Sequence, residues 1–225
     1  MKHCEEKAGQ RRGPSAWPFP ILVTILMVVV AIGAVAQSGA TGRIEYLEGF
    51  VEVNGSLVDI GETVQSGDIV RTDAGAYAEI VFNGRNIFRI GESTRAVLRL
   101  GGARPGIDLN QGSFTAVFER LRRIGGDNPD FEVRTPTAVG GVRGTSFFVK
   151  VEGPDSTYVC ACNGELQVPL EESTSLNIVG THHRAYRFVK GEAGTVASSA
   201  ELLYHGDDDL DSLAEKIDHT IPWGE

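Results

Sequence analysis

The sequence of 225 residues lacks the short motifs that mark the common hydrolases and nucleotide-binding enzymes. It contains no G-x-S-x-G turn for a nucleophilic serine and no H-E-x-x-H pair for a catalytic zinc ion. The glycine-rich stretch at 140–144 does not open a helix, and it lacks the Lys-Ser/Thr pair of a phosphate-binding loop. We therefore predict that the protein is not an enzyme.

Basic residues are also in short supply. The chain has 21 Lys and Arg against 30 Asp and Glu. Residues 1–36 hold four of the basic and two of the acidic residues, which leaves 17 basic against 28 acidic in the remaining body. An acidic surface repels phosphates, so the composition excludes nucleic acid as a partner.

The N-terminal region differs in kind from the rest. Residues 1–20 form a basic leader, and an apolar run from Ile21 to Ala36 follows. The run ends in Ala34-Val35-Ala36, the small-residue pattern of a signal-peptidase site. It is either a cleaved signal peptide or a single membrane anchor. In both cases we expect the body to be exported, to a periplasmic or other extracytoplasmic location.

The body has the pattern of an all-β domain. Short apolar or alternating runs, bounded by Gly, Asn or Asp, recur roughly every 10–15 residues from Gly49 to Val168. Asn54-Gly55 is a strong hairpin signal between two of them. The pattern predicts a mainly β fold, either a sandwich or roll or a short β-solenoid, because each gives short strands with glycine corners.

A helix is predicted near the C-terminus, within an extension at 169–225. The segment 207–219 places Leu210, Leu213, Ala214 and Ile217 on one face, and Asp207–Asp209 suit a helix N-terminus.

The segment from Arg134 to Val149 predicts a strand, a tight glycine-rich connection and a second strand. Pro136 cannot donate to a sheet and so ends or edges the first strand. The glycines at 140, 141 and 144 indicate either positive φ or close approach by another chain.

Cysteine is scarce, with three in the chain. Cys4 falls in the leader. Cys160 and Cys162 are two apart on a predicted strand, so both thiols face one side. They are interpreted as small buried hydrophobic residues, as a redox pair, or as metal ligands.

Three histidines follow the cysteine pair, at His182, His183 and His205. Two cysteines and two histidines would complete a tetrahedral site for zinc or copper, although the spacing departs from that of a zinc finger. Adjacent histidines on a strand point to opposite faces, so at most one of His182 and His183 is expected in a shared site. His205, with Asp207 and Asp208, is interpreted rather as a capping cluster of the last helix.

Several stretches over residues 42–168 resemble, in order, the FecR domain family of bacterial envelope proteins. They are GETV at 61–64 with GDIVRT at 67–72, AEIVF at 78–82 with NIFRI at 86–90, VRTPTA at 133–138 with GVRGT at 141–145, and the closing strand at 162–168.

The resemblance implies a non-enzymatic sensing or interaction domain of the bacterial envelope, which binds a protein or polymer partner for signalling or scaffolding. Type members span the inner membrane once, control a sigma factor from the cytoplasm and contact a TonB-dependent receptor in the periplasm. Here about twenty residues, broken by Gly13, Pro14, Pro18 and Pro20, precede the apolar run. We therefore expect no direct sigma-factor binding.

The family's most recognisable signature falls on seven positions of this chain. The resemblance makes them either partner contacts or structural landmarks, with Arg143 expected to pin the glycine-rich connection by bonding to nearby carbonyls or to lie at the contact surface. They are Arg134, Thr135, Pro136, Gly141, Arg143, Gly144 and Thr145.

The alternative to partner binding is a metal- or redox-responsive envelope domain. It would use the cysteine pair and the histidines.

Overall fold

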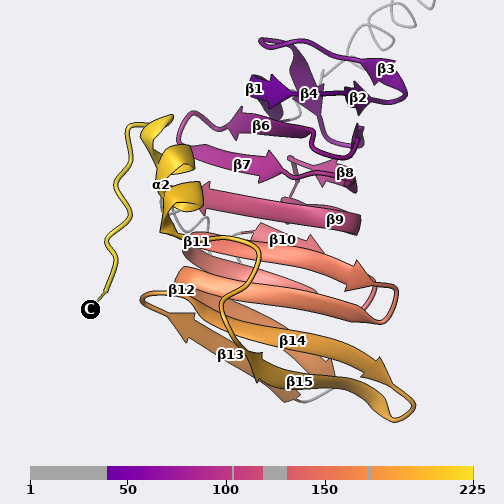
Figure 1. Ribbon diagram of the computed structural model, residues 1–225, viewed down its shortest axis with the longest axis vertical. Coiled ribbons are helices and arrows are strands. Elements are labelled where there is room, and N and C mark those ends of the chain that lie inside the picture. Colours follow the sequence, from indigo (N-terminus) through magenta and orange to yellow (C-terminus); the bar gives the residue numbers. More distant parts are fainter. Residues whose placement is uncertain (1–39, 103, 119–130, 172–173, 225) are drawn as a thin grey trace, which may run out of the picture. The chain divides into compact units, whose positions relative to one another are not determined.

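One continuous sheet dominates the computed structural model, which describes residues 40–102, 104–118, 131–171 and 174–224. The range Gly39–Glu225 forms one compact unit. The predicted mainly β fold with one C-terminal helix is confirmed (Figure 1). The elements are β1 (Thr41–Glu48), β2 (Val51–Val53), β3 (Ser56–Leu57), β4 (Thr63–Gln65), β5 (Ile69–Thr72), β6 (Tyr77–Phe82), β7 (Asn86–Ile90), β8 (Arg95–Arg99), β9 (Gly106–Phe118), β10 (Phe131–Arg134), β11 (Val139–Gly153), β12 (Ser156–Glu171), β13 (Thr174–Gly180), β14 (Arg184–Gly191), β15 (Gly194–Ala200) and α2 (Asp207–Glu215).

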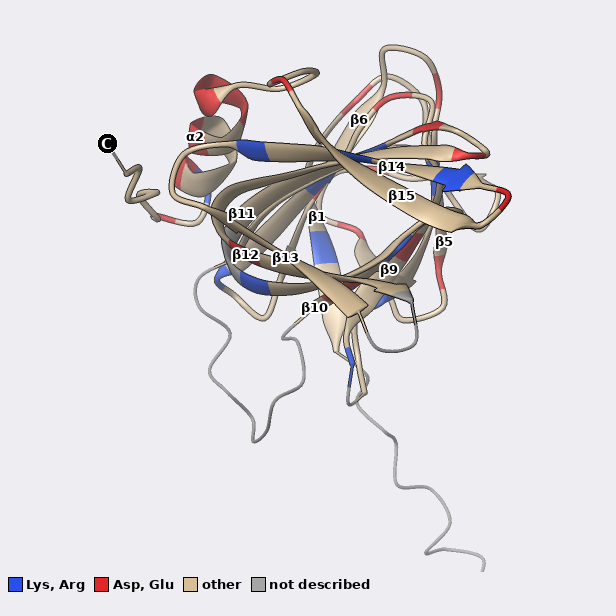
Figure 2. Cartoon of the chain, turned by 90° about the horizontal axis from the view of Figure 1, so that it is seen from below, with Lys and Arg blue, Asp and Glu red and all other residues tan. Residues whose placement is uncertain are grey.

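Three long strands, β9, β11 and β12, fold this sheet into two layers, because each pairs with different neighbours along its two halves. The first half of β9 pairs with β8, and its second half pairs with β7. The first half of β12 pairs with β14, and its second half pairs with β13. The first half of β11 pairs with β10, and its second half pairs with β9. The view along the long axis shows the strands wrapping around a closed interior (Figure 2).

In two of the long strands, β9 and β12, a glycine lies at the bend between the layers. The residues that face the core are odd-numbered before this glycine and even-numbered after it. In β12, Val159 and Ala161 face the core before Gly164, and Leu166 and Val168 face it afterwards. Gly164 has φ +135°, a conformation that L side chains rarely adopt. Without the shift, one half of the strand would turn its apolar residues to the outside.

The same device recurs in β9. Ile107 and Leu109 face the core before Gly112, and Phe114 and Ala116 face it afterwards. Gly112 has φ +87°, and a Cβ there would lie 2.0 Å from Thr94 Oγ1.

The glycine-rich connection predicted inside Arg134–Val149 is wrong. The turn lies earlier, at 135–138, and residues 139–153 form the single strand β11. Gly140 is extended, and a Cβ there would meet only Val168, at an ordinary 3.8 Å. Gly144 pairs with Gly164 of β12, where register shifts mark the fold between the two layers. The glycines at 140, 141 and 144 therefore lie near a bend within one strand and not in a connection between two strands.

Other predicted breaks are also absent. The pairs of short strands expected at 107–109 and 113–118, and at 157–162 and 165–168, are merged in β9 and β12. Residues 174–200 add three strands, β13 to β15, that the pattern analysis did not predict. The hairpin at Asn54-Gly55 is present, with φ of 54° and 80° at the two residues.

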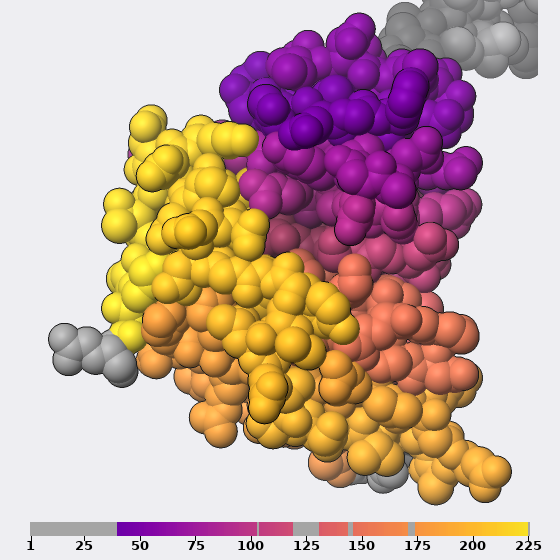
Figure 3. All heavy atoms as spheres, viewed as in Figure 1, coloured from indigo at the N-terminus to yellow at the C-terminus, as the bar shows by residue number. Residues whose placement is uncertain are grey.

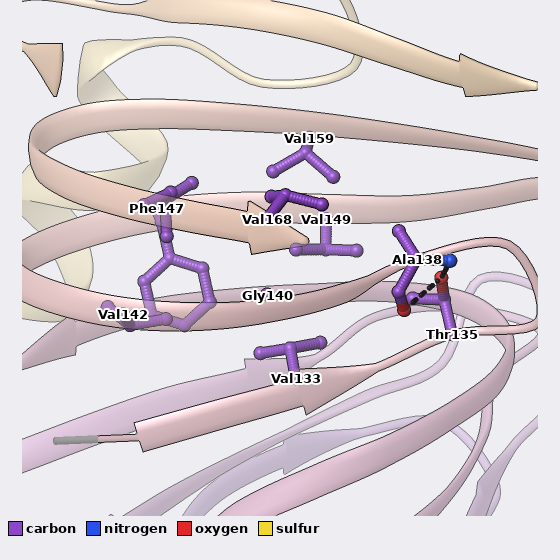
Figure 4. A pocket seen from close by; sticks show the side chains of 10 residues that line it. Val133, Thr135, Ala138, Gly140, Val142, Phe147, Val149, Val159 and Val168 are labelled. Carbon is purple, nitrogen blue, oxygen red and sulfur yellow. Dashed lines mark hydrogen bonds between the residues drawn. The ribbon is translucent and has the colours of Figure 1, made fainter. Parts of the chain in front are cut away.

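Aromatic rings fill the space between the layers. Six phenylalanines pack with ring centroids 4.8–6.1 Å apart, distances typical of favourable aromatic pairs. A cavity of about 10 Å³ remains beside Val133, Val149 and Val168 (Figure 4). That is about the space of one water molecule. The lining is apolar apart from Thr135, whose hydroxyl is already hydrogen-bonded to Ala138, so this cavity is a packing defect rather than a ligand site.

A second apolar cluster lies on the outer face of the sheet. It joins Phe148, Tyr158, Cys160 and Cys162 of the sheet to residues of the C-terminal segment, which comprises residues 201–224. In the space-filling view this segment, in yellow, lies across the neighbouring strands (Figure 3). Both faces of the central strands are therefore buried.

The helix α2 docks through its predicted face. Leu210, Leu213 and Ala214 are buried, and Ile217 packs against them from just beyond the helix. Its N-cap is Gly206, whose N–H donates to Asp209 Oδ2 at 3.0 Å. Three aspartates occupy the first turn, where the helix dipole favours negative charge.

No helix among the described residues is long and apolar enough to cross a membrane. The leader at 1–20 and the predicted signal or anchor at 21–36 lie outside the described residues.

A chain of three threonine hydroxyls, two of them on buried residues, holds the turn between β10 and β11. Thr137 Oγ1 donates to Thr157 Oγ1 at 2.6 Å, and Thr157 donates to Thr135 Oγ1 at 3.0 Å. Thr135 in turn donates to the Ala138 carbonyl at 3.0 Å. Thr157 is fully buried, so each hydroxyl depends on the next for its hydrogen bonds.

Replacing Thr157 by valine keeps the shape of the side chain but interrupts this chain of hydroxyls. We expect Thr157→Val to lower the free energy of unfolding by about 1–3 kcal/mol, the cost of leaving buried polar groups unsatisfied. Denaturant unfolding monitored by circular dichroism measures this. Thr63→Val, at an exposed position on β4, is the matched control and should change stability by less than about 0.5 kcal/mol. Equal effects of the two substitutions would contradict the role of the hydroxyl chain.

Candidate functional site

Two cysteines and two histidines meet between the outer face of the sheet and the C-terminal segment. Cys160 and Cys162 lie on β12, His183 lies in the turn between β13 and β14, and His205 lies between β15 and α2. One ligand atom from each of the four lies within 4.8 Å of the other three. The structure thus brings together four of the five residues predicted as metal ligands.

The two thiols point to the same side of β12, each toward a different histidine. Cys160 Sγ lies 3.7 Å from His183 Nδ1, and Cys162 Sγ lies 3.3 Å from His205 Nε2. Both cysteines are fully buried and neither forms a disulfide.

The remaining nitrogen of each imidazole is held by an oxygen. His183 Nε2 lies 2.6 Å from Asp207 Oδ1, in the first turn of α2. His205 Nδ1 lies 2.9 Å from the Leu203 carbonyl and donates to it, since a carbonyl can only accept. Each ring is thereby fixed with its other nitrogen directed at a thiol.

His182 does not join the four, but it also does not point away from His183. The two histidines lie in a turn rather than on a strand, and His183 has φ +47°. Both Nε2 atoms therefore reach the same carboxylate, with His182 3.0 Å from Asp207 Oδ1. The expectation of opposite faces is wrong because it assumed a strand.

His205 is not part of a helix cap. Its ring stacks on Phe148, with centroids 4.3 Å apart and planes at 12°. The cap of α2 is made by Gly206 and Asp209 instead. The capping interpretation is therefore corrected: His205 faces the cysteine pair.

The groups of the cluster change one another's pKa values. Hydrogen bonding from Cys162, with further contributions from His183 and His205, lowers the pKa of the Cys160 thiol to about 4 against the effect of burial. Burial raises the pKa of Cys162. Interaction with Cys160 raises the pKa of His183, and the two imidazoles lower the pKa of Asp207. The arrangement therefore favours the thiolate form of Cys160.

The end of the chain closes over the cluster. The Trp223 ring packs against His183, with centroids 5.3 Å apart, and its Nε1 donates to Asp211 at 3.2 Å. Gly224 N–H donates to the Thr181 carbonyl at 3.0 Å. The turn that carries the histidines also needs Gly180, where a Cβ would lie 2.0 Å from the Ala161 carbonyl oxygen.

A groove of about 380 Å³ borders the site. It runs between the sheet and the C-terminal segment and is lined in part by Phe148, Tyr204, His205 and Asp209. It gives solutes a path toward His205.

The seven signature positions do not converge on this cluster. Arg134 ends β10 and pairs with Glu132 at 2.7 Å, and Thr135 and Pro136 form the turn. The other four, Gly141, Arg143, Gly144 and Thr145, follow along β11. Arg143 stands opposite Glu165 in the ladder with β12.

Sequence reasoning missed three contributors to the cluster. Asp207 was expected only to favour the helix terminus, and Phe148 and Trp223 carried no expectation at all. Their separation along the chain from the cysteines left no spacing pattern. The one available signal was the acidic run that begins two residues after His205.

These features define an all-β domain with a covered cysteine–histidine cluster. Residues 68–167 match the model of the family described as FecR protein. The match includes both cysteines and ends before all three histidines and α2.

Two crystal structures show a limited likeness to the chain. They are the 1.65 Å and 2.50 Å structures of a candidate anti-sigma factor from Parabacteroides distasonis ATCC 8503, each with 14% identity and a TM-score of 0.47. The alignment covers 59% of this chain and 60% of that one. No curated protein matches the sequence.

Glu152 anchors the segment that carries His205. Its carboxylate accepts two hydrogen bonds from Arg187 at 2.7 Å, one from Ser156 at 2.6 Å and one from Tyr204 at 2.8 Å. Chiefly the bonds from Arg187 lower the pKa of Glu152 from 4.5 to about 2.

A lowered pKa makes this anchor sensitive to acid. Its stabilisation is complete above pH 4.5 and is lost as the pH falls toward about 2. We expect Glu152→Gln to lower the free energy of unfolding by about 1–3 kcal/mol at pH 7 and to converge with the wild type near pH 2. Denaturant unfolding across this pH range measures the difference. Glu192→Gln, at an exposed turn position, is the control, and a pH-independent difference for Glu152→Gln would contradict the proposed anchor.

Proposed function

We propose that the chain is an exported, non-enzymatic regulatory domain that binds a protein partner in the bacterial envelope by extending its sheet at β15. The FecR domain at 68–167 supports a regulatory role. The single observation that carries the binding mode is the edge strand β15. No other strand of the described residues pairs with its outer side.

Edge strands of stable proteins are usually blunted, since an open edge pairs with other chains. β15 has the sequence GTVASSA, without charge, proline or a register shift in its ladder with β14. Val196 is 65% exposed and stands opposite Val189, which is 41% exposed. An extended segment of a partner could form backbone hydrogen bonds with this edge and cover the two valines.

The surface charge favours some partners over others. The acidic body disfavours nucleic acid, and α2 carries Asp207, Asp208, Asp209 and Asp211 close together (Figure 2). Pairing through the backbone favours a protein over a polysaccharide, because only a peptide presents the matching N–H and C=O groups.

Site-specific photo-crosslinking in intact cells tests the edge. With the photoreactive residue at Val196, we expect a discrete crosslinked protein that is absent when the residue replaces Arg95, an exposed position on β8. Ser198→Lys places a charge on the edge and should reduce the crosslink at least about tenfold, while Ser198→Ala should preserve it. A crosslink that is equal in the two Ser198 variants, or no crosslink above the Arg95 control, would contradict binding at β15.

Export is tested separately. Fused at its C-terminus to a reporter that is active only outside the cytoplasm, the full chain is expected to give activity that deletion of residues 21–36 abolishes. Unchanged activity after the deletion would contradict export through this segment.

A further inference from the structure

We propose that Cys160, Cys162, His183 and His205 bind one zinc ion, which fastens the C-terminal segment to the outer face of the sheet. Neither the FecR match nor the proposed binding at β15 calls for a metal. The inference comes from the ligand atoms, their second partners and their burial.

The spacing of the four atoms suits tetrahedral zinc. Zn–S bonds of about 2.3 Å and Zn–N bonds of about 2.0–2.1 Å imply ligand atoms about 3.3–3.8 Å apart. Cys160 Sγ and His183 Nδ1 are 3.7 Å apart, Cys162 Sγ and His205 Nε2 are 3.3 Å apart, and all four atoms lie within 4.8 Å of one another. A tetrahedral S₂N₂ set selects zinc over magnesium or calcium, which prefer oxygen.

Both imidazoles are oriented as metal-bound histidines are. Such a histidine presents one nitrogen to the metal and donates the other N–H to a carboxylate or carbonyl. His183 presents Nδ1 and is held at Nε2 by Asp207, while His205 presents Nε2 and is held at Nδ1 by the Leu203 carbonyl. The two rings direct different nitrogens at the thiols, and each donates its other N–H to an oxygen. Packing alone would not require this arrangement.

The surroundings indicate a structural rather than a catalytic ion. All four coordination positions are supplied by the protein, and both cysteines are fully buried. Binding would release thiol protons to solvent and pair two thiolate charges with the charge of the ion. The adjoining groove of about 380 Å³ reaches His205 and provides an entry path.

A disulfide is the competing use of the cysteine pair. Residues two apart on an extended strand have Cα atoms about 6.6 Å apart, near the upper limit for a disulfide. Oxidation would also leave the two histidines facing no ligand. The geometry therefore favours the metal.

The ion would join three segments that are distant in the chain: β12, the turn at 181–183 and the stretch leading into α2. Loss of the ion should loosen residues 201–224 first, because the inner core between the layers contains none of the ligands.

Metal content of the full-length chain, purified without a polyhistidine tag, is the first test. Plasma mass spectrometry is expected to find about one zinc per chain in the wild type and in Cys4→Ser, and little in the Cys160→Ser/Cys162→Ser double variant. Cobalt(II) in place of zinc should give the intense d–d bands of a tetrahedral site and a thiolate charge-transfer band. Zinc retained by the double variant, an octahedral cobalt spectrum, or a Cys160–Cys162 disulfide found by peptide mass spectrometry would overturn the proposal.

A second variant pair tests the orientation of His183 without removing a ligand. Asp207→Asn is expected to weaken zinc binding by about 10–100-fold in chelator competition, as loss of an outer carboxylate does. Asp208→Asn, exposed and one residue along, keeps the same charge change and should bind as the wild type does. Equal affinities of the two variants would overturn the role of Asp207.

The fastening role has its own readout in wild-type protein, which avoids any variant that fails to fold. Hydrogen exchange is expected to rise at residues 201–224 when a chelator removes the metal and to return when zinc is restored, with no change in β6. The chain has two tryptophans, Trp17 and Trp223, so the fluorescence of a Trp17→Phe variant comes from Trp223 alone. This fluorescence should change when the metal is removed and recover when zinc is restored. Unchanged exchange after complete metal removal would overturn the fastening role.

Discussion

The central constraint on this fold is that the first half of β12, through Cys162, is buried on both faces. Its inward residues pack between the two layers, and Tyr158, Cys160 and Cys162 point outward into a second apolar cluster. A single sheet cannot cover its own outer face, so the C-terminal segment must lie on it. The positions of α2 and His205 and the burial of the two thiols all follow from that requirement.

The fold class and the terminal helix could be predicted because their signals are local. Alternation marks strands, and four apolar residues at helical spacing mark α2. The folding of the sheet could not be predicted, because it depends on one-residue parity shifts at Gly112 and Gly164. Glycine at such a position looks the same in sequence as glycine at a turn, which is why the segment at 140–144 was misassigned.

The ligand types of the candidate site could be predicted, but its geometry could not. Cys160 and Cys162 share a face because strand periodicity demands it. His183 reaches them only because the turn at 181–183 gives it a left-handed backbone. Phe148 and Trp223 orient the histidines by stacking, a tertiary effect that leaves no spacing in the sequence.

The FecR match ends at residue 167, between the cysteines and the histidines. The domain thus supplies two sulfur atoms on a surface that only a later part of the chain covers. A chain with the same sheet but no such cover would expose two thiols to solvent and to oxidation. The cysteine pair and the C-terminal segment are therefore expected to be inherited as a unit, so that related sequences carry both or neither.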